Sequence, residues 1–386
     1  NRIKECKNCS HETKPSMLQI EPVGFVHGYS VKPITGFHET IKSKATRAKT
    51  NMETPPDRVK INDVISYAKT RDYITYTNIG PKGEGFDYCR KCGKLTISSK
   101  KALETGHTTL HPSLGNRCPS QDILTNVVFG TECITDIMFI NFDFQTLPIC
   151  LKPDATATKI VLKTITEALS KAATNILELE PSEISGVYRH NLSNRDSRGK
   201  IIDIILFDTS ENGAGYSSSP QLTAEDVIKE AVRILKDCAA GCDSSCYRCL
   251  RSFNNRFNHE NFDRYLGQIL LESTLDQTMP DFDEERINEA YEKLSKDLMR
   301  IGGDDWEFKR NYEIDIAGVG RVEIPLVVKK NDQKFYSLCN PLTEGKFFDK
   351  KLEEVNNLTT TEIYPIDELM VKMSLPQASN IIRSHF

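Results

Sequence analysis

The chain contains 386 residues, of which 38% are hydrophobic and 27% charged, and its formal net charge is −4. This length is sufficient for two or three domains with more than one buried core. The net charge excludes a uniformly basic protein that coats nucleic acid, so any DNA contact must come from local patches. The longest apolar runs, such as residues 204–207, fall far short of the roughly 20 residues of a membrane span, and we expect a soluble, cytoplasmic protein.

Residues 1–72 are interpreted as an N-terminal segment with a cysteine pair, short strands around residues 24–29 and a basic loop. The pair, Cys6 and Cys9, has the spacing of half a metal site. Because the chain starts at Asn1 beside this pair, we expect the segment to continue upstream and to supply the remaining ligands there. Two alternatives stay open. The pair is reduced and unliganded, or it recruits Cys133, Cys150 or Cys339.

The basic stretch of this segment, residues 41–50, has no hydrophobic periodicity and is followed by two prolines. Such a pattern predicts a mobile loop. Its cations are candidates for contacts with DNA phosphates, and the alternative is a solvated loop without a ligand. The candidate residues are Lys42, Lys44, Arg47 and Lys49.

A central module, residues 73–275, begins with the β-forming stretch 73–77 and continues into the first cysteine cluster. Cys89, Cys92 and Cys118 supply three thiols, and a structural Zn²⁺ usually has four ligands in tetrahedral geometry. We favour His111 as the fourth ligand, because the sequence HPSLGNRC returns to Cys118 through one compact turn. His107 is the alternative.

The remainder of this module has a mixed αβ pattern. Residues 138–144 alternate as in a strand with one buried face, and the run 201–207 predicts a buried strand. Residues 162–176, 227–238 and 262–270 have apolar residues at helical spacing. The glycine-rich turn ENGAGY after the second strand is interpreted as a tight strand-to-helix connection, with a phosphate-binding turn as the weaker alternative.

Four further cysteines lie within a dozen residues of one another. Four thiolates complete the coordination of one tetrahedral Zn²⁺ and leave no position for a reacting water, which favours a structural zinc over a catalytic one. The first cysteine is expected in the last turn of the helix 227–238. The predicted ligands of this second cluster are Cys238, Cys242, Cys246 and Cys249.

Basic and aromatic residues alternate around the second cluster. Arginine binds phosphate through paired hydrogen bonds, and aromatic rings stack on unpaired bases. Arg248, Arg251 and Arg256 are therefore candidate nucleic-acid ligands on one exposed face. In the alternative interpretation the aromatic rings pack on the zinc loop, and the arginines are solvated or pair with Glu260 and Asp263.

Residues 276–386 predict a separate C-terminal domain. A helix over residues 283–301 precedes two strands joined through residues 318–320, a third strand and a helix near residues 347–356. The whole chain is predicted to be α+β, with a mixed αβ module that contains zinc knuckles. The sequence has no GxxxxGK[ST] motif, so we expect no ATP hydrolysis by this chain alone and no catalytic residue.

Several stretches resemble one family, in the order in which that family has them: GEGFDYCRKCG, HPSLGNRC, FGTECITDIMFI, IILFDTSENGAGY and CDSSCYRCLRSFNNRFNHENFDR. Together they resemble the zinc-binding module (MZB) named for the repair helicase MrfA. That module occurs at the C-terminus of bacterial superfamily 2 helicases and in DrmB, a subunit of the DISARM anti-phage system.

This resemblance implies a non-catalytic module that binds DNA and works with a superfamily 2 helicase, either in the same chain or as a partner subunit. Two structural zinc ions are implied, and a third if Cys6 and Cys9 also bind metal. The alternatives are a scaffold that docks a helicase without touching DNA, and the tail of a single-chain helicase.

Overall fold

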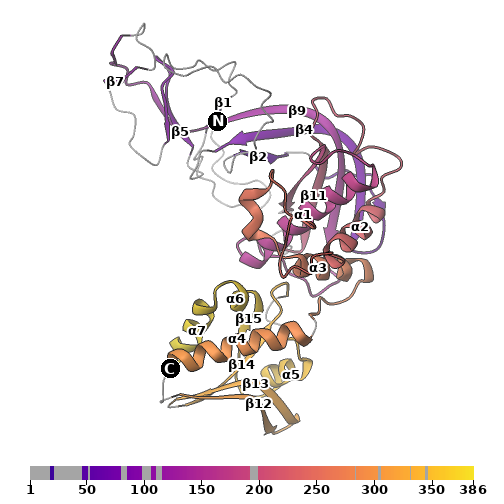
Figure 1. Ribbon diagram of the computed structural model, residues 1–386, viewed down its shortest axis with the longest axis vertical. Coiled ribbons are helices and arrows are strands. Elements are labelled where there is room, and N and C mark those ends of the chain that lie inside the picture. The colour runs from indigo at the N-terminus through magenta and orange to yellow at the C-terminus, as the bar shows by residue number, and fades with distance from the viewer. Residues whose placement is uncertain are drawn as a thin grey trace.

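The computed structural model describes residues 18–20, 46–50, 53–79, 85–97, 106–109, 115–191, 199–282, 284–302, 306–330, 332–343 and 347–386. Some predictions concern residues outside these ranges. The residues concerned are Cys6, Cys9, the strands near 24–29, Lys42, Lys44 and His111. In the described part the α+β class is confirmed, because helices and mixed sheets alternate along the chain (Figure 1).

The larger sheet has nine described strands, with the order β10-β11-β9-β4-β2 along its main path. Its strands are β1 (Leu18–Ile20), β2 (Thr46–Lys49), β3 (Val59–Lys60), β4 (Ile65–Asn78), β5 (Phe86–Cys89), β6 (Leu95–Ile97), β9 (Ile123–Asp143), β10 (Ile184–His190) and β11 (Ile201–Asp208). Two short strands, β7 (His107–Thr108) and β8 (Arg117–Cys118), pair separately. The antiparallel pair β4–β9 spans the whole length of β4 and forms the spine of this sheet.

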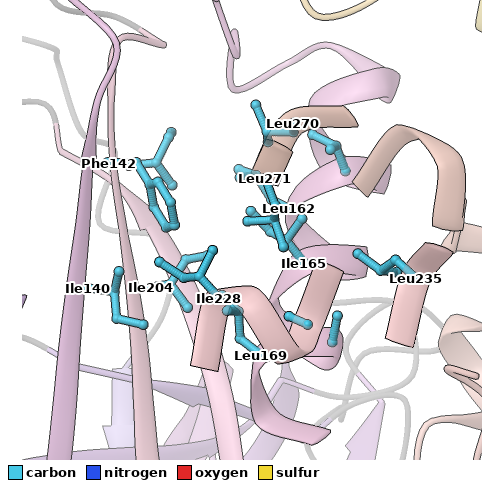
Figure 2. Packing of buried hydrophobic residues seen from close by; sticks show 14 of the residues in the cluster. Ile140, Phe142, Leu162, Ile165, Leu169, Ile204, Ile228, Leu235, Leu270 and Leu271 are labelled. Atoms are coloured by element: carbon cyan, nitrogen blue, oxygen red, sulfur yellow. The ribbon is translucent and has the colours of Figure 1, made fainter. Parts of the chain in front are cut away.

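Three helices cover one face of this sheet: α1 (Thr156–Ile176), α2 (Ala224–Lys236) and α3 (Arg264–Asp276). Apolar side chains of β9 and β11 point toward the apolar sides of these helices (Figure 2). The sheet contributes the almost fully buried Ile140, Phe142 and Ile204 to this interface. The helices contribute Leu162 and Leu271, which have no exposed surface. The helical spacing predicted all three helices because it places these apolar residues on one side.

The opposite face of β9 is buried as well, so the prediction of a strand with one buried face is wrong. Phe139, Ile137 and Phe207 have no exposed surface and form a second cluster with Ile74 on that face. Alternation of residue type marks the two faces of a strand, but it does not report what covers each face. Burial on both faces explains the short, wholly apolar runs at residues 137–140 of β9 and 204–207 of β11.

Part of the predicted basic loop is a strand. Residues Thr46–Lys49 form β2, which pairs antiparallel with β4, where Lys49 lies opposite Thr75. Lys49 is exposed. The segment lacks hydrophobic periodicity because it is an edge strand, and exposed edge strands commonly carry lysine, which discourages pairing with other chains.

The C-terminal part is a four-stranded sheet of order β12-β13-β14-β15, in which β15 runs parallel to β14. The elements are α4 (Glu284–Gly302), β12 (Glu307–Ile316), β13 (Gly320–Lys329), β14 (Gln333–Cys339), α5 (Lys350–Leu358), β15 (Ile363–Asp367), α6 (Glu368–Met373) and α7 (Leu375–Ser384). Helices α4, α6 and α7 pack on one face, and α5 packs on the other. The sequence predicted the elements up to α5, and β15, α6 and α7 were missed.

Buried charges join this C-terminal part to the central module. Arg286 of α4 donates to both carboxylate oxygens of Glu368, at 2.8 and 3.0 Å, and lies 3.5 Å from Asp263, the N-cap of α3. Lys372 of α6 lies 3.2 Å from the second oxygen of Asp263. Two cations therefore meet two carboxylates in a region where all four side chains are mostly withdrawn from water.

Candidate metal centres and the adjoining surface

The second metal centre, defined by Cys238, Cys242, Cys246 and Cys249, has the geometry of a tetrahedral site. All four sulfur atoms lie within 4.8 Å of one another. Four of the sulfur–sulfur separations run from 3.6 to 3.8 Å. A tetrahedron with Zn–S bonds of about 2.3 Å has edges of about 3.8 Å, so these residues fit one Zn²⁺.

The same centre adjoins the main hydrophobic core. Cys249 is 1% exposed and belongs to the core cluster, and the other three cysteines pack against it. Cys238 follows the end of α2 and does not lie in its last turn, which corrects the sequence prediction. A four-thiolate site that is closed by its own protein ligands contributes folding free energy and offers no position for a substrate.

One buried cation, Arg264, and one half-buried cation, Lys171, support the loop that carries these cysteines. Arg264 donates to the carbonyl oxygens of Cys242 and Leu235, each at 2.7 Å, and its own backbone N–H donates to Ser244 at 2.7 Å. Lys171 of α1 donates to the carbonyl oxygen of Cys249. Zinc with four thiolates carries a net charge of −2, and these cations lie where they offset it. Sequence spacing could not identify them, because both come from other helices.

His259 lies near this centre without joining it. Its Nε2 atom is 3.0 Å from the carbonyl oxygen of Ser252 and 2.9 Å from the Asn255 side-chain oxygen. Its ring also contacts that of Tyr247 edge to face, with centroids 5.4 Å apart. His259 therefore stabilises the segment after the cysteines, as expected for a histidine ten residues beyond Cys249.

At each centre one thiol is poised to be a thiolate at neutral pH. Burial raises the pKa of Cys238, but backbone amides of Ala240 and Cys242 and neighbouring thiols outweigh burial and lower the pKa to about 6. The pKa of Cys89 is lowered to about 6 in the same way, where the amides of Cys92 and Lys91 outweigh burial. The thiolate is the form that binds metal, so each site has one thiol ready for zinc at pH 7, whereas burial raises the pKa of Cys92, Cys242 and Cys249.

The first metal centre brings together Cys89, Cys92, Cys118 and His107. Their ligand atoms all lie within 4.8 Å of one another, and Cys89 and Cys118 have sulfur atoms 3.9 Å apart. The Nε2 atom of His107 lies 3.2 Å from the Cys92 sulfur. Short strand pairs hold these residues in place, since His107 lies opposite Cys118 in the β7–β8 ladder. The residues fit a zinc ion held by three cysteines and one histidine.

The structure therefore gathers His107, the alternative fourth ligand, while the favoured His111 lies outside the described residues. We propose His107 as the ligand. His107→Ala should weaken zinc binding at this centre by more than the tenfold to hundredfold that loss of a supporting residue costs. His111→Ala should leave it unchanged. Zinc content after titration with a chelator checks both variants. If His111→Ala lost zinc more readily than His107→Ala, His111 would be the fourth ligand.

The surface beside the second centre carries exposed aromatic rings and three arginines, of which Arg248 is exposed and Arg251 and Arg256 are half-buried. We call this surface the Arg/aromatic strip. Tyr247, Phe253 and Phe257 are 68%, 58% and 44% exposed. The Arg256 guanidinium lies between two of these rings, 4.4 Å from the centroid of Phe253 and 4.5 Å from that of Phe257. The strip consists of Tyr247, Arg248, Arg251, Phe253, Arg256 and Phe257.

The arginines of the strip keep their charge available. Arg251 and Arg256 line the same surface depression, together with Phe257, His259 and Glu260. Arg248 is exposed on the loop beside Tyr247. None of the three arginines forms an ion pair with a described acidic side chain, and Asp263 pairs with Arg286 and Lys372 instead. The alternative in which Asp263 neutralises the strip is therefore wrong.

The glycine-rich turn after β11 is a structural connection. The Asp208 carboxylate accepts hydrogen bonds from the backbone N–H groups of Ala214, Tyr216 and Ser217 at 2.8 to 2.9 Å. The N–H of Gly215 donates to Asp136 at 3.2 Å. Because protein carboxylates occupy these donors, the turn has no free cradle for a phosphate.

Comparison with known proteins confirms the family resemblance for the second centre. Residues 165–250 match the family model MZB, described as the MrfA Zn-binding domain, and this range contains all four cysteines. The chain is 26% identical over 359 residues to Druantia protein DruE of Escherichia coli (strain UMEA 4076-1), covering 88% of this chain and 18% of that protein. The chain thus spans less than a fifth of this relative.

A crystal structure of the DUF1998 helicase MrfA bound to DNA is also similar to the chain. The similarity covers 60% of this chain and 24% of that one, at 14% identity and a TM-score of 0.34. In the described part of the chain, no helix has both the length and the apolar character needed to cross a membrane.

Proposed function

We propose that the chain is a non-catalytic, zinc-stabilised module that binds DNA and works with an ATP-driven helicase in an anti-phage defence or DNA-repair system of the cytoplasm. The Arg/aromatic strip carries this proposal. Three rings that are 44% to 68% exposed lie next to three arginines without acidic partners among the described residues. Large exposed aromatic side chains usually mark a binding surface.

The chemistry of the strip fits nucleic acid. Arginine binds phosphate oxygens, and each ring that stacks on a base contributes about 1 to 3 kcal/mol. The second zinc and the hydrogen bonds of His259 and Asn255 fix the backbone of the strip before any ligand arrives. A surface that is ordered in advance loses less entropy on binding.

The helicase association rests on the family match. The matched domain is named for MrfA, and it contains the second metal centre. Zinc there stabilises the fold and does no chemistry, so the energy for movement along DNA must come from an ATP-driven motor. We propose that this motor is a superfamily 2 helicase, as a domain of the same protein or as a partner subunit.

Charge reversal of the strip tests DNA binding. In the triple variant Arg248→Glu, Arg251→Glu and Arg256→Glu, the slope of log affinity against log salt should fall by roughly 2 to 3 for a short duplex with a single-stranded end, since each phosphate contact contributes about 0.7 to 0.9. Fluorescence anisotropy over a salt series measures this slope. Zinc content and melting temperature show whether the variant is folded.

A matched variant controls for net charge. Lys296→Glu, Lys350→Glu and Lys351→Glu change the charge equally at exposed positions of α4 and α5 and should leave the slope unchanged. Binding that is absent or insensitive to salt would contradict the proposal. If charge reversal of the strip abolished co-purification with the helicase and left DNA binding intact, the strip would dock a protein instead.

A further inference from the structure

The first metal centre lies at the end of a long β-arm. Strand β9 pairs with β11 only along its residues 137–143, whereas its residues 123–136 continue beyond that pairing, alongside β4 and β5. At about 3.3 Å per residue this extension is roughly 45 Å long. Figure 1 shows β5 and β7 at its end, remote from α1, α2 and α3.

The end of this arm, which we call the tip, presents three cations. Arg90 and Lys91 lie between Cys89 and Cys92, and Arg117 precedes Cys118; all three cations are exposed. Arg90 has one acidic neighbour, Asp122, at 3.7 Å in an exposed pair, and such pairs are weak. Lys91 and Arg117 form no ion pair with any acidic side chain in the described ranges.

The metal centre does not itself account for these charges. With zinc bound, three thiolates and a neutral histidine give a net charge of −1, which one cation offsets. Lys94 already lies at the tip, where its ammonium donates to the carbonyl oxygen of Thr108 at 2.7 Å. The positive charges of Arg90, Lys91 and Arg117 therefore exceed what is needed to neutralise the metal site.

The backbone that carries these cations is fixed. The backbone N–H of Gly93 donates to the carbonyl oxygen of Cys89, and the N–H of Cys89 donates to the carbonyl oxygen of Lys94, both at 2.9 Å. The N–H of Arg90 donates to the carbonyl oxygen of Asp122 at 3.1 Å. These bonds order the backbone around Arg90 and Lys91, and the pairing of β7 with β8 orders the backbone of Arg117. A rigid, exposed group of cations is suited to bind phosphates of a nucleic-acid backbone.

We propose that the tip is a second phosphate-binding surface, which contacts DNA already held at the Arg/aromatic strip. This inference rests on the proposed function. The arm alone is as long as about 13 phosphates of one strand at 3.4 Å each, so we expect DNA longer than this to be needed for simultaneous contact with both surfaces. Shorter DNA is expected to bind mainly at the strip, where aromatic rings add to the phosphate contacts.

DNA length separates the two surfaces experimentally. Affinities of the whole chain for duplexes of about 10, 20 and 40 base pairs are compared across a salt series. For the longer duplexes, Arg90→Glu, Lys91→Glu and Arg117→Glu together should lower the salt slope by roughly 2 to 3 and the affinity at low salt at least tenfold. For the shortest duplex they should change neither.

Two further variants complete the test. The variant Arg90→Gln, Lys91→Gln and Arg117→Gln should lose affinity for the longer duplexes in the same way but to a smaller extent. A full zinc content demonstrates that its tip is intact. The control Lys296→Glu, Lys350→Glu and Lys351→Glu should behave as the unmodified chain at every length. Unchanged binding of the longest duplex by both tip variants would overturn this inference and leave the strip untouched, whereas absent binding at every length would refute the proposed function itself.

Discussion

Cys249→Ser should remove zinc from the second metal centre and unfold the helical layer of the central module. Cys249 is 1% exposed, and its sulfur packs with the core shared by α1, α2 and α3. Structural zinc contributes roughly 10 to 16 kcal/mol in small zinc domains, which is comparable with the 5 to 15 kcal/mol stability of a whole domain. Zinc content should fall by one ion per chain, with loss of helical circular dichroism and a much lower melting temperature.

Cys150→Ser is the matched control for this change. Cys150 is a partly buried cysteine outside both metal centres, so the substitution makes the same chemical change without removing a ligand. Its zinc content should be unaltered. If Cys249→Ser kept a full zinc content and melted within a few degrees of this control, the second centre would not be holding the helices together.

Asp263→Asn should loosen the attachment of the C-terminal part to the central module. Asparagine can still cap α3, so the change removes the negative charge and largely spares the helix end. Arg286, 3.5 Å from the carboxylate, would keep Glu368 as its buried anion, whereas Lys372, at 3.2 Å, would keep only the exposed Asp243. Removing one member of a buried ion pair costs about 3 to 5 kcal/mol. Urea unfolding and proteolysis of the segment 277–283 measure the effect.

The pH dependence of this effect has a definite sign. Burial raises the pKa of Asp263, but Arg286, Lys372 and the N–H of Leu266 outweigh it and hold the pKa below its ordinary value. A carboxylate with a lowered pKa stabilises the fold above its unfolded-state pKa, about 3.9, and loses this contribution as the pH falls through the folded-state pKa. The difference in the free energy of unfolding between the chain and its Asp263→Asn variant should therefore stay constant from pH 8 to pH 5. It should shrink as the pH falls further, through the folded-state pKa of Asp263.

An exposed ion pair provides the comparison. Glu230 pairs with Arg233 on α2 at 2.6 Å, but the Arg233 side chain is 63% exposed. Glu230→Gln should cost less than about 1 kcal/mol, because water screens such pairs. Equal costs for Glu230→Gln and Asp263→Asn would mean that the charges between the two parts of the chain do not stabilise their contact.

The sequence determined those features that depend on residues close together in the chain. The cysteine spacings identified seven of the eight residues that the structure gathers at the two metal centres, since structural zinc sites commonly draw their ligands from closely spaced cysteines. Apolar residues at helical spacing identified α1, α2, α3 and α4 for a similar reason. Strand β10 was missed because most of its side chains are only half-buried, so that it has no clear apolar face.

Only the tertiary structure decided what depends on residues far apart in the chain. The approach of His107 to the three cysteines depends on the pairing of β7 with β8, and burial of both faces of β9 requires the packing of separate segments. The support of the second centre by Lys171 and Arg264 comes from two other helices. Asp263 follows the arginines of the strip closely in the sequence, yet it binds Arg286 and Lys372 of the C-terminal part. The interaction of two charges depends on their distance in space, and their separation along the sequence does not give that distance.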